Sequence, residues 1–227
     1  YYDTDVFFSL GEQSADPAIL LGARLGRVVP VGSFFMELAS SQFQETSRCE
    51  WDIVNFCGNA FMPGSYCDIY DTHNQDYQEH LLWLKMLADE LPGLRIGIKH
   101  HSNYRYQHGE RELMESYGLG IIDEKEDSYS IAARSRIAVS WASTMVGEIF
   151  AYGRPAFFLN PHGRNSQFHG SQSPTTKICF QTYRDFRKAV LDIIENGFTP
   201  IKTSGTLCYR SDYVSRTIWK YLIDNQR

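Results

Sequence analysis

Short apolar runs alternate with longer amphipathic segments after residue 50 of the chain. The apolar runs predict buried strands, and apolar side chains three and four positions apart predict helices. The predicted strands lie at residues 52–57, 94–99, 119–122, 137–140, 156–159 and 177–180. The predicted helices lie at residues 75–91, 110–117, 127–134, 143–152, 183–196 and 212–224. This alternation favours an α/β fold with a mostly parallel, Rossmann-like sheet and helices on both faces.

The first 50 residues have a pattern of their own. Residues 5–10 and 27–32 predict two strands, and Pro30 within the second is typical of an edge or irregular strand. Residues 17–25 predict a short helix between them, and residues 39–50 are polar enough to predict a linker. We therefore expect residues 1–48 to be the end of a preceding α/β domain with its linker, and residues 49–227 to be a second domain.

The candidate chemistry centres on residues 137–161, where a strand, a helix and a second strand predict a βαβ unit. The turn that opens the helix carries Ser140, Ser143 and Thr144. Their hydroxyls and the free N–H groups of the first helical turn would suit phosphate oxygens. Glu148 follows on the same helical face and could accept hydrogen bonds from ribose or sugar hydroxyls. The alternative is that these residues are only helix caps and a solvated charge.

Other polar side chains follow neighbouring strands, where ligands of parallel sheets bind. Lys99 and Arg164 offer positive charge for a diphosphate, and His100 or His101 could donate N–H groups to it. Because neighbours in an extended segment face opposite ways, only one of the two histidines can face a given site. The alternative for Lys99 is a solvated basic surface.

Composition and missing motifs exclude several functions. The formal net charge of -5 argues against a general nucleic-acid-binding surface, and no run approaches the roughly 18 apolar residues of a membrane span. The five cysteines have no CxxC spacing, which fits a reducing cytoplasm. There is no HExxH, GxGxxG or GxSxG motif. We expect no metal and no cofactor.

Three segments carry a resemblance to a known family. The run SWASTMVGEIFAYGRPAFFLNP, residues 140–161, resembles the nucleotide-sugar-binding half of GT-B glycosyltransferases. There a Ser/Thr turn opens a helix, a Glu lies within it, and G-x-P leads to the next strand. The run KHHSNY, residues 99–104, resembles a histidine motif of bacterial capsule and surface-polysaccharide transferases, although its usual form is His-Pro and Ser102 follows His101 here. The opening segment resembles the end of the N-terminal domain in those enzymes.

The resemblance implies a glycosyltransferase of surface-polysaccharide synthesis. Its partners would be a nucleotide-sugar donor, a glycan or other acceptor, and an upstream N-terminal domain that supplies any catalytic base. The catalytic residues stay unassigned. The protein would be cytoplasmic, with attachment at the inner face of the membrane left open. Two rival functions remain, a nucleotide-sugar 2-epimerase of the same fold and a non-catalytic nucleotide-sugar-binding module.

Overall fold

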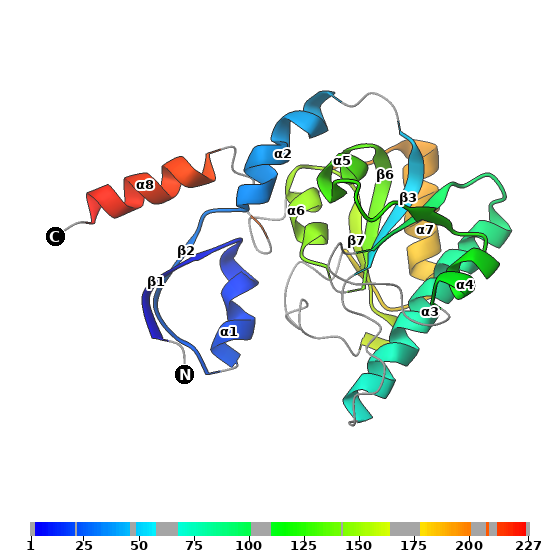
Figure 1. Ribbon diagram of the computed structural model, residues 1–227, viewed down its shortest axis with the longest axis horizontal. Coiled ribbons are helices and arrows are strands. Elements are labelled where there is room, and N and C mark those ends of the chain that lie inside the picture. The colour runs from blue at the N-terminus through cyan, green and yellow to red at the C-terminus, as the bar shows by residue number, and fades with distance from the viewer. Residues whose placement is uncertain are drawn as a thin grey trace.

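Two parallel β-sheets organise the chain (Figure 1). The structure is a computed structural model that describes residues 3–20, 22–45, 49–57, 68–100, 110–141, 143–163, 178–200, 208 and 213–225. Within these residues the larger sheet has six strands, and the smaller has two. The two sheets correspond to the two parts of the chain that the sequence pattern separates.

The six strands of the larger sheet follow the order β5-β4-β3-β6-β7-β8, and every pairing is parallel. The strands are β3 (Trp51–Cys57), β4 (Ile96–His100), β5 (Gly120–Ile122), β6 (Ser135–Ser140), β7 (Ala156–Leu159) and β8 (Cys179–Phe180). The predicted parallel sheet is confirmed. The chain winds outward from β3 to β5 and then returns to β6, so the switch point, where ligands of such sheets bind, lies between β3 and β6.

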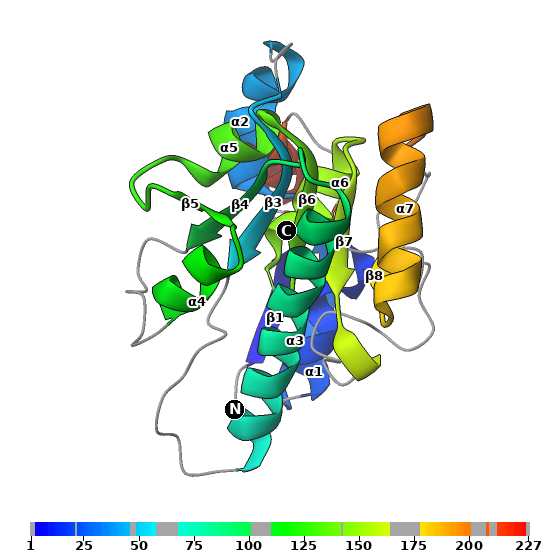
Figure 2. The same ribbon diagram turned by 90° about the vertical axis from the view of Figure 1, so that its right-hand side faces the viewer.

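Helices cover both faces of this sheet (Figures 1 and 2). One face carries α3 (Asp68–Glu90) and α7 (Tyr183–Asn196), with α4 (Glu110–Ser116) beside α3. The other carries α5 (Ser128–Ala133) and α6 (Met145–Ala151). Asp127 caps α5 by accepting a hydrogen bond from the Ser130 N–H. The predicted helices are confirmed, although α3 begins seven residues earlier than position 75 and α6 begins after, not at, Ser143.

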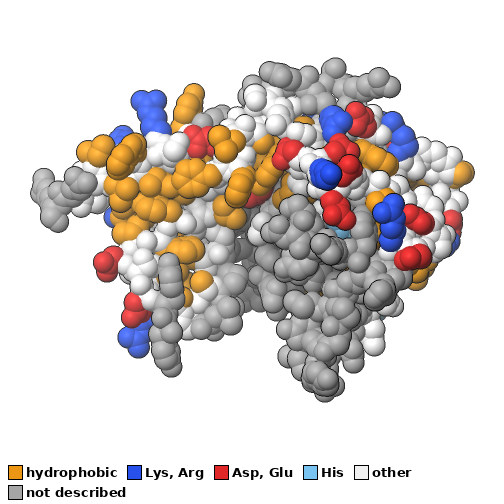
Figure 3. Space-filling model, in the orientation of Figure 1, with side chains coloured by type: hydrophobic (Ala, Val, Ile, Leu, Met, Phe, Trp, Pro, Cys, Tyr) orange, Lys and Arg blue, Asp and Glu red, His pale blue; other side chains and the backbone are white. Residues whose placement is uncertain are grey.

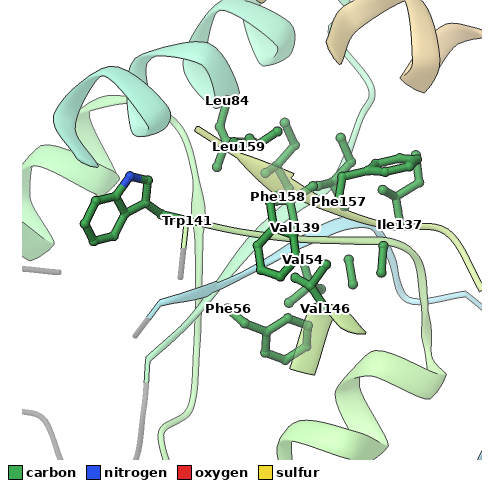
Figure 4. Packing of buried hydrophobic residues seen from close by; sticks show 14 of the residues in the cluster. Val54, Phe56, Leu84, Ile137, Val139, Trp141, Val146, Phe157, Phe158 and Leu159 are labelled. Atoms are coloured by element: carbon green, nitrogen blue, oxygen red, sulfur yellow. The ribbon is translucent and has the colours of Figure 1, made fainter. Parts of the chain in front are cut away.

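The hydrophobic core lies between the sheet and its helices (Figure 4). Val54 of β3, Val139 of β6 and Phe158 of β7 are almost fully buried within it, and Leu84 reaches it from α3. Strands with helices on both faces need apolar side chains at successive positions. This explains why the strands appear in the sequence as continuous apolar runs.

The smaller sheet pairs β1 (Asp3–Ser9) with β2 (Arg24–Pro30) in parallel. They are joined through η1 (Glu12–Ala15) and α1 (Asp16–Leu20). The helix predicted over residues 17–25 is shorter because Gly22, with φ of 92°, ends it and the chain enters β2. Pro30 is the last residue of β2, where its missing N–H costs the sheet little.

Residues 39–50, predicted as a polar linker, contain most of a helix instead. The helix α2 covers Phe34–Glu45. Met36 and Ala39 are buried and Phe43 packs against the core, so the apolar side chains follow helical spacing despite the Ser and Gln residues between them. That part of the linker prediction is wrong, because polar composition hid the amphipathic pattern. The predicted domain boundary after residue 48 stays a prediction.

The last helix, α8 (Val214–Asp224), packs beside the smaller sheet. The Tyr221 ring meets Phe8 edge-on at 5.5 Å, and the Arg27 guanidinium lies 5.1 Å from the same ring. Ser215 donates from its N–H and its hydroxyl to the Glu37 carboxylate of α2. Hydrophobic side chains gather on the outside of α2 and α8 (Figure 3), and the exposed ones include Phe34, Phe35, Leu38, Trp219 and Ile223. Among the described residues, no helix has both the length and the apolar character of a membrane span.

Candidate functional site

Ser140 builds the turn at the switch point of the sheet. It ends β6, is fully buried, and its hydroxyl donates to the Phe56 carbonyl of β3 at 2.6 Å. The same oxygen accepts a hydrogen bond from the Ser143 N–H at 3.0 Å. Ser140 therefore joins the two central strands and folds the chain into the helix α6. The Ser140 hydroxyl therefore hydrogen-bonds within the protein and fixes the shape of the turn.

Ser143 and Thr144 stand at the beginning of α6, as predicted from the sequence. The Ser143 side-chain oxygen accepts from the Met145 N–H at 3.3 Å. Thr144 is exposed, and its side chain makes no capping hydrogen bond. Small hydroxyl residues suit this position because their side-chain oxygens can accept hydrogen bonds from the first N–H groups of a helix. Two hydroxyls therefore lie at the carboxyl edge of the sheet, beside the switch point.

Glu148 lies below these hydroxyls but is buried, with only 4% of its surface exposed. The Tyr129 hydroxyl of α5 donates to its Oε2 at 2.6 Å, and Ser33, in the turn before α2, lies close to its carboxyl group. Burial raises the pKa of Glu148, and the neighbouring hydroxyls, Tyr129 first and Ser33 second, oppose that shift. Burial and the nearby Glu148 also raise the pKa of the Cys208 thiol to about 12. The carboxyl group is thus held by side chains from distant parts of the chain.

Lys99 and His100 occupy opposite faces of β4, as expected for neighbours in a strand. Lys99 pairs with Phe56 and His100 with Cys57 on β3. Lys99 is 2% exposed, and its ammonium group donates to the carbonyls of His100 at 3.2 Å and Glu124 at 2.7 Å. Burial lowers the pKa of Lys99, while carboxylates led by Glu124 oppose the shift. The ammonium group therefore holds the backbone at Glu124, just after β5. His100 is buried on the opposite face of β4, the face that α3 covers.

His101 and Arg164 lie outside the described residues, so their predicted contacts with phosphate stay predictions. Among the residues that the structure describes, no three His, Cys, Asp or Glu side chains gather as metal ligands would. The described part of the site therefore consists of hydroxyls, backbone N–H groups, the buried imidazole of His100 and one buried carboxyl group.

Two polar features of this region were not assigned from the sequence. His80 of α3 is fully buried, with its Nε2 2.8 Å from Oδ1 of Asn55 in β3. Two sequence features could have indicated this pair: an Asn inside an apolar strand and a His on the apolar face of a helix. His162, after β7, has a φ of 61° and pairs with Glu79 of α3 at 2.7 Å. No sequence pattern indicates that pair, because it depends on how a loop meets a helix.

Comparisons with known proteins agree on the fold alone. No protein-family model matches the chain, and no curated protein matches its sequence. Solved structures do match. A UDP-GlcNAc 2-epimerase from Neisseria meningitidis, bound to UDP-GlcNAc, shares 11% identity over 98% of this chain and 62% of its own, with a TM-score of 0.58.

A candidate UDP-N-acetylglucosamine 2-epimerase from Listeria monocytogenes shares 10% identity over 99% of this chain and 61% of its own, with a TM-score of 0.63. The S. aureus MnaA–UDP structure shares 13% identity over 97% of this chain and 60% of its own, with a TM-score of 0.61. The fold is of the GT-B type. The chain spans about three fifths of the length of these GT-B proteins.

Proposed function

We propose that this GT-B chain binds a nucleotide sugar and belongs to an enzyme of the nucleotide-sugar 2-epimerase kind. The observation that carries the proposal is the match of 98% of the chain to a 2-epimerase that holds UDP-GlcNAc. The sequence favoured a glycosyltransferase and kept the epimerase as an alternative. The matched structures favour that alternative, because three of those with a TM-score above 0.5 are named as UDP-N-acetylglucosamine 2-epimerases.

The described site supports the nucleotide-sugar binding that this function requires. Bond cleavage at the anomeric carbon of a nucleotide sugar leaves a diphosphate anion, which preorganised donors stabilise. Ser143, Thr144 and the first N–H groups of α6 would donate to the diphosphate, together with His100 or His101 and with Arg164. Ser140 and Lys99 would support these groups by fixing the turn and the backbone. Glu148 would accept hydrogen bonds from ribose hydroxyls.

An assay without an acceptor tests the proposed reaction. The full-length protein is incubated with UDP-GlcNAc, and the products are identified by NMR. We expect the C2 epimer to appear with no acceptor present. Products that form only when a glycan acceptor is added would identify a glycosyltransferase instead. A parallel thermal-shift panel of CMP, CDP, UDP, GDP and ADP reports binding, because a ligand of the native state raises the melting temperature. Stabilisation by none of them would contradict the proposal.

Removing the two hydroxyls at the start of α6 should weaken nucleotide binding. The double variant Ser143→Ala, Thr144→Ala retains helix propensity but loses two donors. Each hydrogen bond contributes about 0.5–1.5 kcal/mol, and more with a charged partner, so the Kd for UDP should rise roughly tenfold or more. Calorimetry measures the change, and a single cooperative thermal transition without ligand shows that the fold is intact, with the melting temperature lowered slightly by loss of the Ser143–Met145 hydrogen bond. An unaltered Kd would mean that these hydroxyls serve only as helix caps.

We expect UDP binding to survive the removal of divalent metal. The proposed diphosphate ligands are hydroxyls, N–H groups and cationic side chains, which need no bridging metal. The Kd for UDP is measured with EDTA and then with added magnesium or manganese. Equal values are expected. Binding that disappears with EDTA and returns with either metal would refute the expectation.

We further infer that the smaller sheet belongs to an acceptor-side N-terminal domain. Within the described part of the chain no further strand pairs with β1 or β2, and a pair of strands alone is marginally stable in water. Apolar side chains on α2 and α8 stand exposed beside it (Figure 3). More strands and helices of the same layer would cover both features. The glycan acceptor of the transferase alternative would bind on that domain.

A further inference from the structure

The helix α5 is short, and contacts with other elements fix its position. Its six residues are too few for a helix to be stable alone in water, so its order depends on those contacts. At its start the Ser130 N–H donates to the Asp127 carboxylate at 2.7 Å. The Ser130 hydroxyl donates to Oε1 of Gln42 in α2 at 2.9 Å. The first turn of α5 is therefore capped and attached to α2.

The backbone before and after α5 is held as well. The buried ammonium group of Lys99 donates to the Glu124 carbonyl, in the turn before the helix, at 2.7 Å. Arg134, which follows the helix, pairs with Glu50 at 2.7 Å and with Glu126 at 2.9 Å. A side chain on α5 therefore projects from a backbone that is fixed at both ends, as a group that orients a ligand-binding residue requires.

Tyr129 connects this fixed helix to the Glu148 carboxyl group. Its hydroxyl donates to Oε2 of Glu148 at 2.6 Å, a distance typical of a hydrogen bond from a hydroxyl to a carboxylate. Its ring stacks on Phe35 of α2, with centroids 6.2 Å apart and planes 16° apart. Rotation of the Tyr129 side chain would break this stacking. The direction from which the hydroxyl meets the carboxyl group is therefore set by α5 and α2 together.

A buried carboxyl group needs such a partner in order to accept hydrogen bonds from ribose. Glu148 is 4% exposed, and burial favours its protonated form, in which one oxygen becomes a donor. The hydrogen bond from Tyr129 favours the charged form instead and holds the carboxylate in one orientation. It uses one of about four acceptor positions of the carboxylate, so two vicinal ribose hydroxyls can bind as well.

We propose that Tyr129 is a positioning residue, which orients the Glu148 carboxylate for the ribose hydroxyls of the nucleotide and so determines the preference for ribose over dideoxyribose. The inference rests on the proposed function, because it concerns the ribose part of that site. It adds a residue from outside the βαβ unit to the nucleotide site. The helix α5 then contributes to ligand specificity through Glu148, without a contact of its own to the nucleotide.

The variant Tyr129→Phe tests this role, since phenylalanine keeps the ring stacking but cannot donate to Glu148. In the full-length protein the Kd for UDP should rise about threefold to tenfold, because one hydrogen bond that supports the acceptor is lost. The Kd for 2′,3′-dideoxyuridine diphosphate, which has no ribose hydroxyls, should stay unchanged. Tyr117→Phe is the matched control, because the Tyr117 ring lies near Lys85 of α3, on the opposite face of the larger sheet. It should leave both Kd values unchanged.

Two further readouts separate positioning from packing. In a Glu148→Gln background, Tyr129→Phe should change the Kd for UDP less than in the wild type, because the carboxylate that it orients is gone. As the pH falls, the affinity for UDP should decline at a higher pH in Tyr129→Phe than in the wild type, because loss of the hydroxyl raises the pKa of Glu148. UDP itself titrates identically in both measurements. The neighbouring Cys208 thiol stays protonated throughout, since burial and Glu148 raise its pKa to about 12.

The outcomes distinguish the positioning role from the proposed function. A wild type that prefers UDP to the dideoxy ligand, with the same preference in Tyr129→Phe, overturns the positioning role and leaves the proposed function standing. Equal affinity of the wild type for the two ligands also overturns it, since Glu148 then does not bind ribose. No UDP binding by the wild type overturns the proposed function, and the positioning role falls with it.

Discussion

Lowering the pH from about 6.5 to about 3 should cost the folded protein several kcal/mol through His80 alone. Burial lowers the pKa of His80 from 6.5 to about 3, because the charged imidazolium would lose its water. In this pH range the unfolded chain takes up a proton that the folded chain does not. The free energy of unfolding therefore falls by about 1.4 kcal/mol per pH unit as the pH decreases. Above pH 6.5 the contribution is constant.

The variant His80→Gln isolates this effect. Glutamine can still hydrogen-bond Asn55 but does not titrate, so its free energy of unfolding should depend less steeply on pH. Urea unfolding at several pH values measures both slopes, and carboxylates affect both proteins alike. Leu84→Ala removes a fully buried side chain one turn further along α3. As the matched control it should lower stability at every pH and keep the wild-type slope. Identical slopes for wild type and His80→Gln would contradict the prediction.

Gly97→Ala should destabilise the larger sheet by about 1–3 kcal/mol, because the core has no room for the added methyl group. A Cβ at Gly97 would lie 2.7 Å from Cδ1 of Ile122 and 2.9 Å from the Trp51 ring. A Cβ at Gly120, the partner of Gly97 on β5, would lie 2.8 Å from the same ring. The two glycines together form a slot for the indole. The free energy of unfolding from urea titration checks the loss.

A double-mutant cycle shows whether the indole is the cause. Trp51→Leu shortens the side chain that fills the slot, so Gly97→Ala should cost less in that background than in the wild type. Gly93→Ala is a comparison for backbone strain without a packing clash, because a Cβ there meets nothing within 4 Å while its φ of 157° is one that side chains rarely adopt. If Gly97→Ala is equally costly with and without the indole of Trp51, the loss comes from the contact with Ile122 or from the strand backbone and not from the indole.

The sequence predicted the larger sheet well because its strands are buried on both faces. Runs such as that of β7 have no polar position, and their separation by amphipathic segments indicates a parallel order. It failed at α2, where Ser and Gln residues surround Met36, Ala39 and Phe43 and resemble a linker. Single-residue polarity misleads when a helix buries only a narrow stripe. In the sequence, the slot for Trp51 appears only as Gly97, a small residue within the strand β4.

The candidate site was predictable in part. Helix-start chemistry is local, so Ser143 and Thr144 could be placed at the beginning of α6 from their neighbours. The environment of Glu148 could not, because Ser33 and Tyr129 reach it from other elements. Lys99 appeared to be an available cation, yet it donates to two backbone carbonyls. Which polar groups stay available for a ligand depends on tertiary contacts that local pattern does not encode.

The position of α8 makes the spatial units of this protein different from its sequence segments. The last helix is joined by Tyr221 to Phe8 and Arg27, near the start of the chain. An isolated helix of this length is marginal in water, so α8 depends on those contacts for its order. Residues 49–227 expressed alone would carry a helix without its support. Thermal melting of the smaller sheet and α8 should therefore be cooperative, because these contacts suppress early fraying at both ends of the described chain.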